Sequence, residues 1–228
     1  MKGYVFIVEH SELIVMLTHN DLTVLNAAEI FDQCKNSKAQ YWGVKEEPLP
    51  LEEMKKLFSY MKACGKTTFL EVVAYSEEEG LEGAKLAHEC CCDIWMGTIL
   101  SDKINKFCQE NKMKYMPFLG NITGRPSVLE GSIDSFIDEA NQYLAKGVFG
   151  FDLLGYRYTG DAKLLNKTVV ESVDAPVCLA GSVDSFEKLD HIKEIKPWAF
   201  TIGSAFFEKK FGDDFAEQID IVCDYMAN

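Results

Sequence analysis

Three ionisable side chains stand where parallel strands are expected to run or end, and they are the candidates for acid–base chemistry. Lys45 follows a short apolar run. A lysine there can donate a proton or, if burial or neighbours depress its pKa, attack a carbonyl to form an imine. Glu71 and Asp152 each lie between apolar residues, where a carboxylate is costly unless it is paired or functional. We predict that Glu71 and Asp152 form a general acid/base pair with Lys45 as partner. The alternatives are a solvated loop at Lys45 and a buried structural network at the carboxylates.

Two Gly-Ser pairs, Gly181-Ser182 and Gly203-Ser204, each follow a short apolar run near the end of the chain. In a parallel α/β barrel they would follow the seventh and eighth strands, where backbone N–H groups and a helix N-terminus form a phosphate site. Glycine suits such a turn because no Cβ blocks the approach of a phosphate oxygen to the main chain. One pair alone would favour an ordinary strand-to-helix turn. Two neighbouring pairs favour a phosphate site.

Arg125 and Arg157 are the only arginines in the chain. Both fall in segments expected to connect a strand to the next helix, on the same side of a barrel as the Gly-Ser pairs. The planar guanidinium group suits a phosphate or a carboxylate. We therefore predict that both arginines bind the anionic group of a ligand; ion pairs with local acids are the alternative.

The elements that must position these residues alternate between apolar strand-like runs and amphipathic helical runs. The strand-like runs are short and apolar on both faces, as buried parallel strands are. No G-x-G-x-x-G motif follows the first of them, which argues against a doubly wound dinucleotide-binding sheet. A spacing of roughly 25 residues per unit is typical of a (β/α)8 barrel. We predict a single α/β domain, a (β/α)8 TIM barrel, over residues 1–228. The expected strands are 13–18, 41–44, 68–73, 93–96, 115–119, 148–153, 177–180 and 199–202.

The position of the first barrel strand stays open. The run 13–18 fits it, while the earlier run 4–8 is either an additional N-terminal strand or the first barrel strand itself.

Weaker candidates for the site also stand at expected strand ends, namely Asp21, Glu46, Thr98 and Asn121.

Composition limits the partners. The net charge of −13 is spread along the expected helices, which argues against nucleic acid and anionic membranes but not against a small anion held by a few local donors. No apolar run approaches the roughly 18 residues of a membrane helix. The N-terminus lacks the small-residue cleavage site of a signal peptide. We expect a cytoplasmic protein with no nucleic-acid or membrane partner.

The eight cysteines are scattered through expected core elements and are expected to be reduced and packed. His88 with Cys90, Cys91 and Cys92 suggests a metal site. However, three adjacent residues cannot all face one ion, and no Cys-x-x-Cys pair occurs elsewhere. We expect a helix end that leads into the fourth strand at this point. We predict no metal and no obligatory cofactor.

The C-terminal third resembles the ribulose-phosphate-binding (β/α)8 barrels. The similarity rests on FDLLGYRYT at 151–159, LAGS at 179–182 and FTIGSAFF at 200–207. Within that group the chain is most similar to the N-acetylmannosamine-6-phosphate 2-epimerase family, over residues 148–211 only. The resemblance implies a phosphorylated sugar or similar metabolite, held through Gly181, Ser182, Gly203 and Ser204.

The catalytic residues of the epimerase family are not matched. That family has a lysine at the end of strand three and a glutamate in the strand-seven turn. Here the corresponding segments read VVAY at 72–75 and AGS at 180–182. The resemblance therefore carries phosphate binding to this chain and not the epimerase reaction.

Together these residues predict an enzyme that acts on a small phosphorylated metabolite, either a sugar-phosphate isomerase or epimerase or an aldolase-type lyase. Glu71 and Asp152 would exchange protons, Lys45 would polarise a carbonyl or form an imine, and Arg157 would hold phosphate with the Gly-Ser turns. The alternative is a barrel without catalysis that binds a phosphorylated ligand as a sensor or partner subunit. A homodimer stays open, since many barrels dimerise but no interface motif can be read from the sequence.

Overall fold

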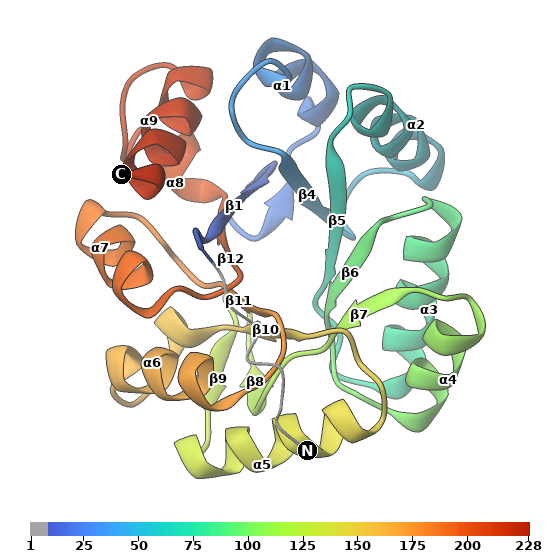
Figure 1. The fold of residues 1–228 in the computed structure, drawn as a ribbon. Helices are drawn as coiled ribbons and strands as arrows, with labels where there is room; N and C mark the ends of the chain where they lie inside the picture. Colours follow the sequence, from blue (N-terminus) through green and yellow to red (C-terminus); the bar gives the residue numbers. More distant parts are fainter. Residues whose placement is uncertain (1–8) are drawn as a thin grey trace.

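The computed structural model describes residues 9–228, which form a closed parallel barrel with helices outside it (Figure 1). The eight barrel strands follow the order β10-β11-β12-β1-β4-β5-β6-β7. Their bounds are β1 Glu12–Met16, β4 Tyr41–Lys45, β5 Thr67–Val72, β6 Ile94–Gly97, β7 Lys114–Met116, β10 Phe151–Leu153, β11 Val177–Leu179 and β12 Ala199–Ile202.

The barrel closes between β7 and β10. Phe118 and Asp152 form a parallel bridge. Two backbone hydrogen bonds join the same segments: the Phe149 N–H donates to Tyr115 O at 2.9 Å, and the Asp152 N–H donates to Pro117 O at 3.0 Å. The strands β7 and β10 are only three residues each, and these bonds close the ring between them. The (β/α)8 barrel expected from the sequence is confirmed.

Helices cover the outer face of the sheet, and several begin at the residue types that cap helices. Ser76 accepts a hydrogen bond from the Glu79 N–H, and Asp161 accepts one from the Leu164 N–H. Such a side chain satisfies a backbone donor that the first helical turn leaves free. The helices are α1 Ala27–Cys34, α2 Leu51–Ala63, α3 Glu77–Glu89, α4 Asp102–Glu110, α5 Ile133–Ala145, α6 Ala162–Ser172, α7 Phe186–Ile195, α8 Ser204–Phe207 and α9 Phe215–Ala227.

Two apolar layers lie on the two faces of the sheet. The larger layer fills the space between strands and helices. The smaller one fills the inside of the barrel and is built from Ile14, Met16, Phe69, Ile94, Met96, Met116, Cys178 and Ala199. Alternate residues of each strand face inward, so Lys45 and Glu71 continue the inward rows toward the C-terminal end of the barrel. Lys45 is the register partner of Glu71, which places their side chains next to each other.

Two segments that connect a barrel strand to the next helix form short antiparallel hairpins at that same end. One pairs β2 Thr18–His19 with β3 Leu22–Thr23, and the other pairs β8 Asn121–Thr123 with β9 Val128–Glu130. A one-turn 3-10 helix, η1 Gly155–Arg157, follows β10. These three segments carry Thr18, Asp21, Ser127 and Arg157, whose side chains lie at the C-terminal end of the barrel.

The first barrel strand is β1, which overlaps the expected run 13–18, whereas 4–8 lies outside the described residues. The expected helix end before the fourth strand is also confirmed, since α3 ends at Glu89 and β6 begins at Ile94. No helix within residues 9–228 combines the length and the apolar character that a membrane crossing requires.

Candidate functional site

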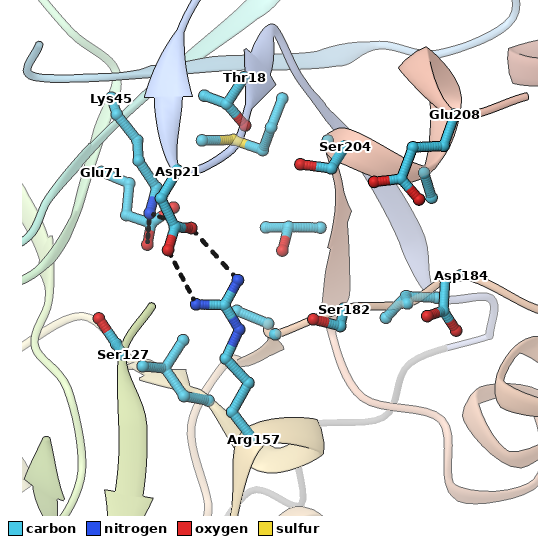
Figure 2. A pocket seen from close by; sticks show the side chains of 18 residues that line it. Thr18, Asp21, Lys45, Glu71, Ser127, Arg157, Ser182, Asp184, Ser204 and Glu208 are labelled. Atoms are coloured by element: carbon cyan, nitrogen blue, oxygen red, sulfur yellow. Dashed lines mark hydrogen bonds and ion pairs between the residues drawn. The ribbon is translucent and has the colours of Figure 1, made fainter. Parts of the chain in front are cut away.

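A cavity of about 140 Å³ opens at the C-terminal ends of the strands. This end of the barrel is where the active sites of the fold lie. Side chains from opposite sides of the barrel meet there: Figure 2 shows Lys45 and Glu71 on one side and Ser182 and Ser204 on the other. The polar residues that line it are Thr18, Asp21, Lys45, Glu71, Ser127, Arg157, Ser182, Asp184, Thr201, Ser204 and Glu208.

A chain of charged groups crosses the cavity. Lys45 Nζ lies 3.4 Å from Glu71 Oε1 and 3.2 Å from Asp21 Oδ1. Both oxygens of Asp21 also accept hydrogen bonds from Arg157, at 3.2 Å each. The side chains of Lys45 and Glu71 are only 8% and 7% exposed, so water screens their charges weakly. Two cations and two carboxylates therefore balance each other in one partly enclosed network.

Lys45 stays an ammonium group at neutral pH. Burial lowers the pKa of Lys45, but the charges of Glu71 and Asp21 and the hydrogen bond to Asp21 outweigh it, so its pKa is raised. The depressed pKa that an imine-forming lysine needs is not what this environment produces. The geometry instead gives a fixed cation that can donate a proton or stabilise a developing negative charge.

Asp21 is the group that joins the two cations. Burial raises its pKa, but the hydrogen bond from Arg157 and the charges of Lys45 and Arg157 outweigh that effect, and the pKa of Asp21 is lowered. Asp21 therefore carries its charge at neutral pH. As one of several polar residues after an expected strand, it had no sequence signal that set it apart. Its role follows from the β2–β3 hairpin, which turns it back over the barrel.

Asp152 occupies a different place from the other two acid–base candidates. It is fully buried inside the barrel and does not line the cavity. Among the described residues, neither of its carboxyl oxygens has a hydrogen-bond partner. Burial first, and the charge of Glu71 second, raise the pKa of Asp152 well above its ordinary range, although Lys45 opposes the shift. Asp152 is thus a neutral carboxylic acid near Glu71 and Lys45, out of reach of a ligand in the cavity.

Both Gly-Ser turns border the cavity, and each glycine lets a neighbouring side chain approach. Gly181 has φ +94°, and a Cβ there would lie 2.9 Å from Arg157 Cγ. A Cβ on Gly203 would lie 2.5 Å from Thr18 Oγ1. The glycines therefore serve a purpose beyond access to the main chain. The turn at Gly181 also seats the stem of the arginine that faces the cavity.

The two arginines are not brought together. Arg157, on η1, lines the cavity, whereas Arg125 lies at the β8–β9 connection and does not. Arg125 Nη2 donates to Glu46 Oε1 and to Val73 O, both at 3.0 Å. It borders a separate, larger cavity of about 710 Å³ beside α3. Arg125 thus differs from its expected place, because the hairpin carries it sideways to a local acid.

Some lining residues could not be singled out from the sequence. Asp184 and Glu208 each pair with a nearby lysine, at 2.8 Å from Lys188 and 3.6 Å from Lys210. Ser127 reaches the cavity from the connection between β8 and β9. Each looks like an ordinary surface residue in the sequence. A single Ser or Asp after a strand carries no signal without the barrel geometry.

The cysteine-rich segment does not form a metal-like cluster. Across residues 9–228, no group of three or more His, Cys, Asp or Glu side chains is arranged to hold a metal ion. Cys90 is buried and Cys91 is exposed, while Cys92 donates its thiol proton to Ile94 O at 3.0 Å. The three neighbours therefore differ in environment.

The buried state of Asp152 predicts a pH effect on stability. A carboxyl whose pKa is higher in the folded than in the unfolded chain retains its proton longer when folded. Above its ordinary value of 3.8, folding stability therefore falls as pH rises. The Asp152→Asn variant lacks this group, so its free energy of unfolding should improve relative to the wild type as the pH rises above 3.8. Urea unfolding at each pH measures the difference.

The exposed Asp138→Asn variant on α5 is the control and should follow the wild-type profile. A constant difference between Asp152→Asn and wild type would contradict the assignment.

Comparisons with known proteins address the fold. Neither protein-family models nor curated protein sequences gave a match. Among solved structures, orotidine 5'-phosphate decarboxylase from Pyrococcus horikoshii OT3 has a TM-score of 0.70 at 13% identity, covering 95% of this chain and 99% of that chain. Thiamine phosphate pyrophosphorylase from Pyrococcus furiosus has a TM-score of 0.66 at 14% identity, covering 95% of both chains.

A protein described as regulatory has the same fold. The glycerol uptake operon antiterminator regulatory protein from Listeria monocytogenes has a TM-score of 0.58 at 15% identity, covering 89% of this chain and 95% of that chain. At these identities the similarity concerns the fold, which can host unrelated functions. This chain therefore shares the (β/α)8 barrel fold of these proteins.

Proposed function

We propose that this protein is an enzyme that acts on a small phosphorylated metabolite, as a sugar-phosphate isomerase or epimerase or as an aldolase-type lyase. The observation that supports it best is a single cavity that joins two Gly-Ser turns and Arg157 to the Lys45–Glu71 pair. The first group suits a phosphate and the second suits proton transfer. In the barrel fold, the loops after the last two strands often hold phosphate.

The phosphate end of the cavity combines three kinds of donor. Ser182 and Ser204 contribute hydroxyl groups, the turns contribute backbone N–H groups, and Arg157 contributes a guanidinium group. Asp184 and Glu208 also border this end and would repel a phosphate. Their ion pairs with Lys188 and Lys210 offset that repulsion. The arrangement suits a phosphate monoester held by Arg157 and the two serines.

At the reactive end, we assign the base to Glu71 and the electrophile to Lys45. Glu71 would remove a proton from a carbon next to a carbonyl, and the Lys45 ammonium would stabilise the negative charge that develops on the carbonyl oxygen. Protonation of the opposite face of the carbon by a water molecule, whose hydroxide is then neutralised by the protonated Glu71, gives an epimer. Protonation of the enolate oxygen, loss of the neighbouring hydroxyl proton and protonation of the former carbonyl carbon by Glu71 give an isomer. The same stabilised enolate would result from cleavage of an aldol carbon–carbon bond.

Asp152 would act through Glu71, without touching the ligand. Two nearby carboxyls in a low-dielectric interior do not both ionise readily. The fully buried one, Asp152, keeps its proton. Glu71 is the only one of the two that lines the cavity, and it pairs there with Lys45. We therefore assign Asp152 as a positioning residue.

The second candidate is a barrel that binds a phosphorylated ligand without turnover. Two observations favour it: Asp152 is closed off from the cavity, and both Lys45 and Arg157 already have an internal partner in Asp21. A ligand that raises the melting temperature without being converted would support this candidate.

The two arginines provide a matched test of the phosphate end. Arg157→Lys should weaken binding of a sugar phosphate at least tenfold, because lysine cannot reproduce the guanidinium fork. Arg125→Lys should change the affinity less than twofold, because Arg125 lies outside this cavity. Isothermal titration with the ligand that stabilises the wild type most measures both. Equal losses in the two variants, or a loss only in Arg125→Lys, would contradict the assignment.

The reaction is tested by turnover of phosphorylated ketoses, aldoses and keto acids. Lys45→Met should lower turnover of the accepted substrate by roughly 10² or more, the usual contribution of a positioned acid or base. Lys66→Met is the matched control. Lys66 is also buried, but it directly precedes β5 and so lies at the end of the barrel away from the cavity. Circular dichroism confirms that both variants fold. Borohydride should trap no adduct on Lys45 during turnover; a trapped adduct would replace the proton-transfer assignment by an imine mechanism.

A further inference from the structure

The centre of the cavity is already occupied by an anion that belongs to the protein. The Asp21 carboxylate lies between Arg157 and Lys45, with one oxygen 3.2 Å from Lys45 Nζ and both oxygens 3.2 Å from the guanidinium nitrogens (Figure 2). This is the bidentate geometry in which arginine binds a carboxylate or phosphate of a ligand. With Asp21 in place, the edge of the Arg157 guanidinium formed by Nη1 and Nη2 is already engaged.

The segment that carries Asp21 is a tight hairpin turn. Asp21 and its neighbour Asn20 have φ values of +63° and +52°, as the two central residues of a two-residue type I′ hairpin turn require. The β2–β3 hairpin on which they stand has only two residues in each strand. Its tip is tied to a Gly-Ser turn, since the Asn20 N–H donates to Ser204 Oγ at 3.1 Å.

The size of the cavity also indicates that something must move. Its volume is about 140 Å³, whereas sites for small organic ligands usually measure roughly 300–1,000 Å³. The Asp21 side chain and the hairpin tip lie directly over Lys45 and Arg157, so their displacement would open the space that a sugar phosphate needs.

We propose that Asp21 is an internal stand-in for the phosphate group of the ligand, which displaces it from Arg157 and Lys45 on binding. The inference rests on the proposed function, because it assumes that Arg157 binds phosphate. Exchange of one anion for another keeps both cations paired, since Lys45 and Arg157 then face Glu71 and the phosphate instead of Glu71 and Asp21. A neutral ligand could not compensate the cations after Asp21 has left. The site thereby selects anionic ligands, such as those with a phosphate group, and stays closed to neutral ones.

The exchange predicts that removal of the Asp21 carboxylate improves phosphate binding. The apparent affinity of a site is reduced by the fraction of molecules in which it is blocked. Asp21→Asn should therefore bind inorganic phosphate at least tenfold more tightly than the wild type. Asp21→Gly should do the same and relieves the positive φ, which glycine adopts freely. Isothermal titration measures the affinities, and circular dichroism checks the fold of each variant.

Glu208→Gln is the control for a change of net charge. Glu208 lines the same cavity but pairs with Lys210, away from Arg157 and Lys45. Its removal should tighten phosphate binding less than threefold. If both Asp21 variants bind phosphate as weakly as the wild type or more weakly, Asp21 orients Arg157 and the stand-in role is wrong, while the proposed function stands. If neither the wild type nor any variant binds phosphate or a sugar phosphate, the proposed function and this inference both fail.

Discussion

The balance of charge around Lys45 is the constraint on which the rest of the site depends. An ammonium group that is 8% exposed must be paired, because an isolated buried charge is very costly. Glu71 supplies one negative charge from the next strand, and Asp21 supplies another from the β2–β3 hairpin. Asp21 also pairs with Arg157. Asp152 then stays neutral, since a third nearby carboxylate would have no cation to face. The protonation states of the network thus follow from which positions are buried and how many cations they share.

The barrel supplies this network through strand register. Lys45 and Glu71 are register partners on β4 and β5, and inward-facing rows of a closed barrel must end at its mouth. The short hairpin and η1 then bring residues far apart in the chain to the same point: Asp21 and Arg157 are 136 positions apart. The rigid part of the fold therefore fixes Lys45 and Glu71, and the connections adjust how open the site is.

The sequence predicted the regular part of this arrangement and missed the irregular part. The alternation of apolar strands and helices was sufficient for the barrel, and the cost of a carboxylate inside a strand was sufficient to single out Glu71 and Asp152. The sequence could not separate their environments, because both are carboxylates inside apolar strands, whereas in the fold Asp152 is fully buried and Glu71 lines the cavity. It also could not separate Arg125 from Arg157, since both follow strands and only the β8–β9 hairpin directs one of them to Glu46. Asp21 owes its place to a hairpin of four paired residues, which has too little periodicity to be recognised.

A crystal structure with a bound sugar phosphate tests the central claim most directly. The account predicts phosphate density between Arg157, Ser182 and Ser204, with the Asp21 carboxylate moved away from the guanidinium group and the carbonyl carbon of the ligand near Lys45 and Glu71. Phosphate density at Arg125, in the separate cavity beside α3, would contradict it. So would a ligand in the central cavity with the Asp21–Arg157 pair unchanged and its phosphate directed away from the Gly-Ser turns.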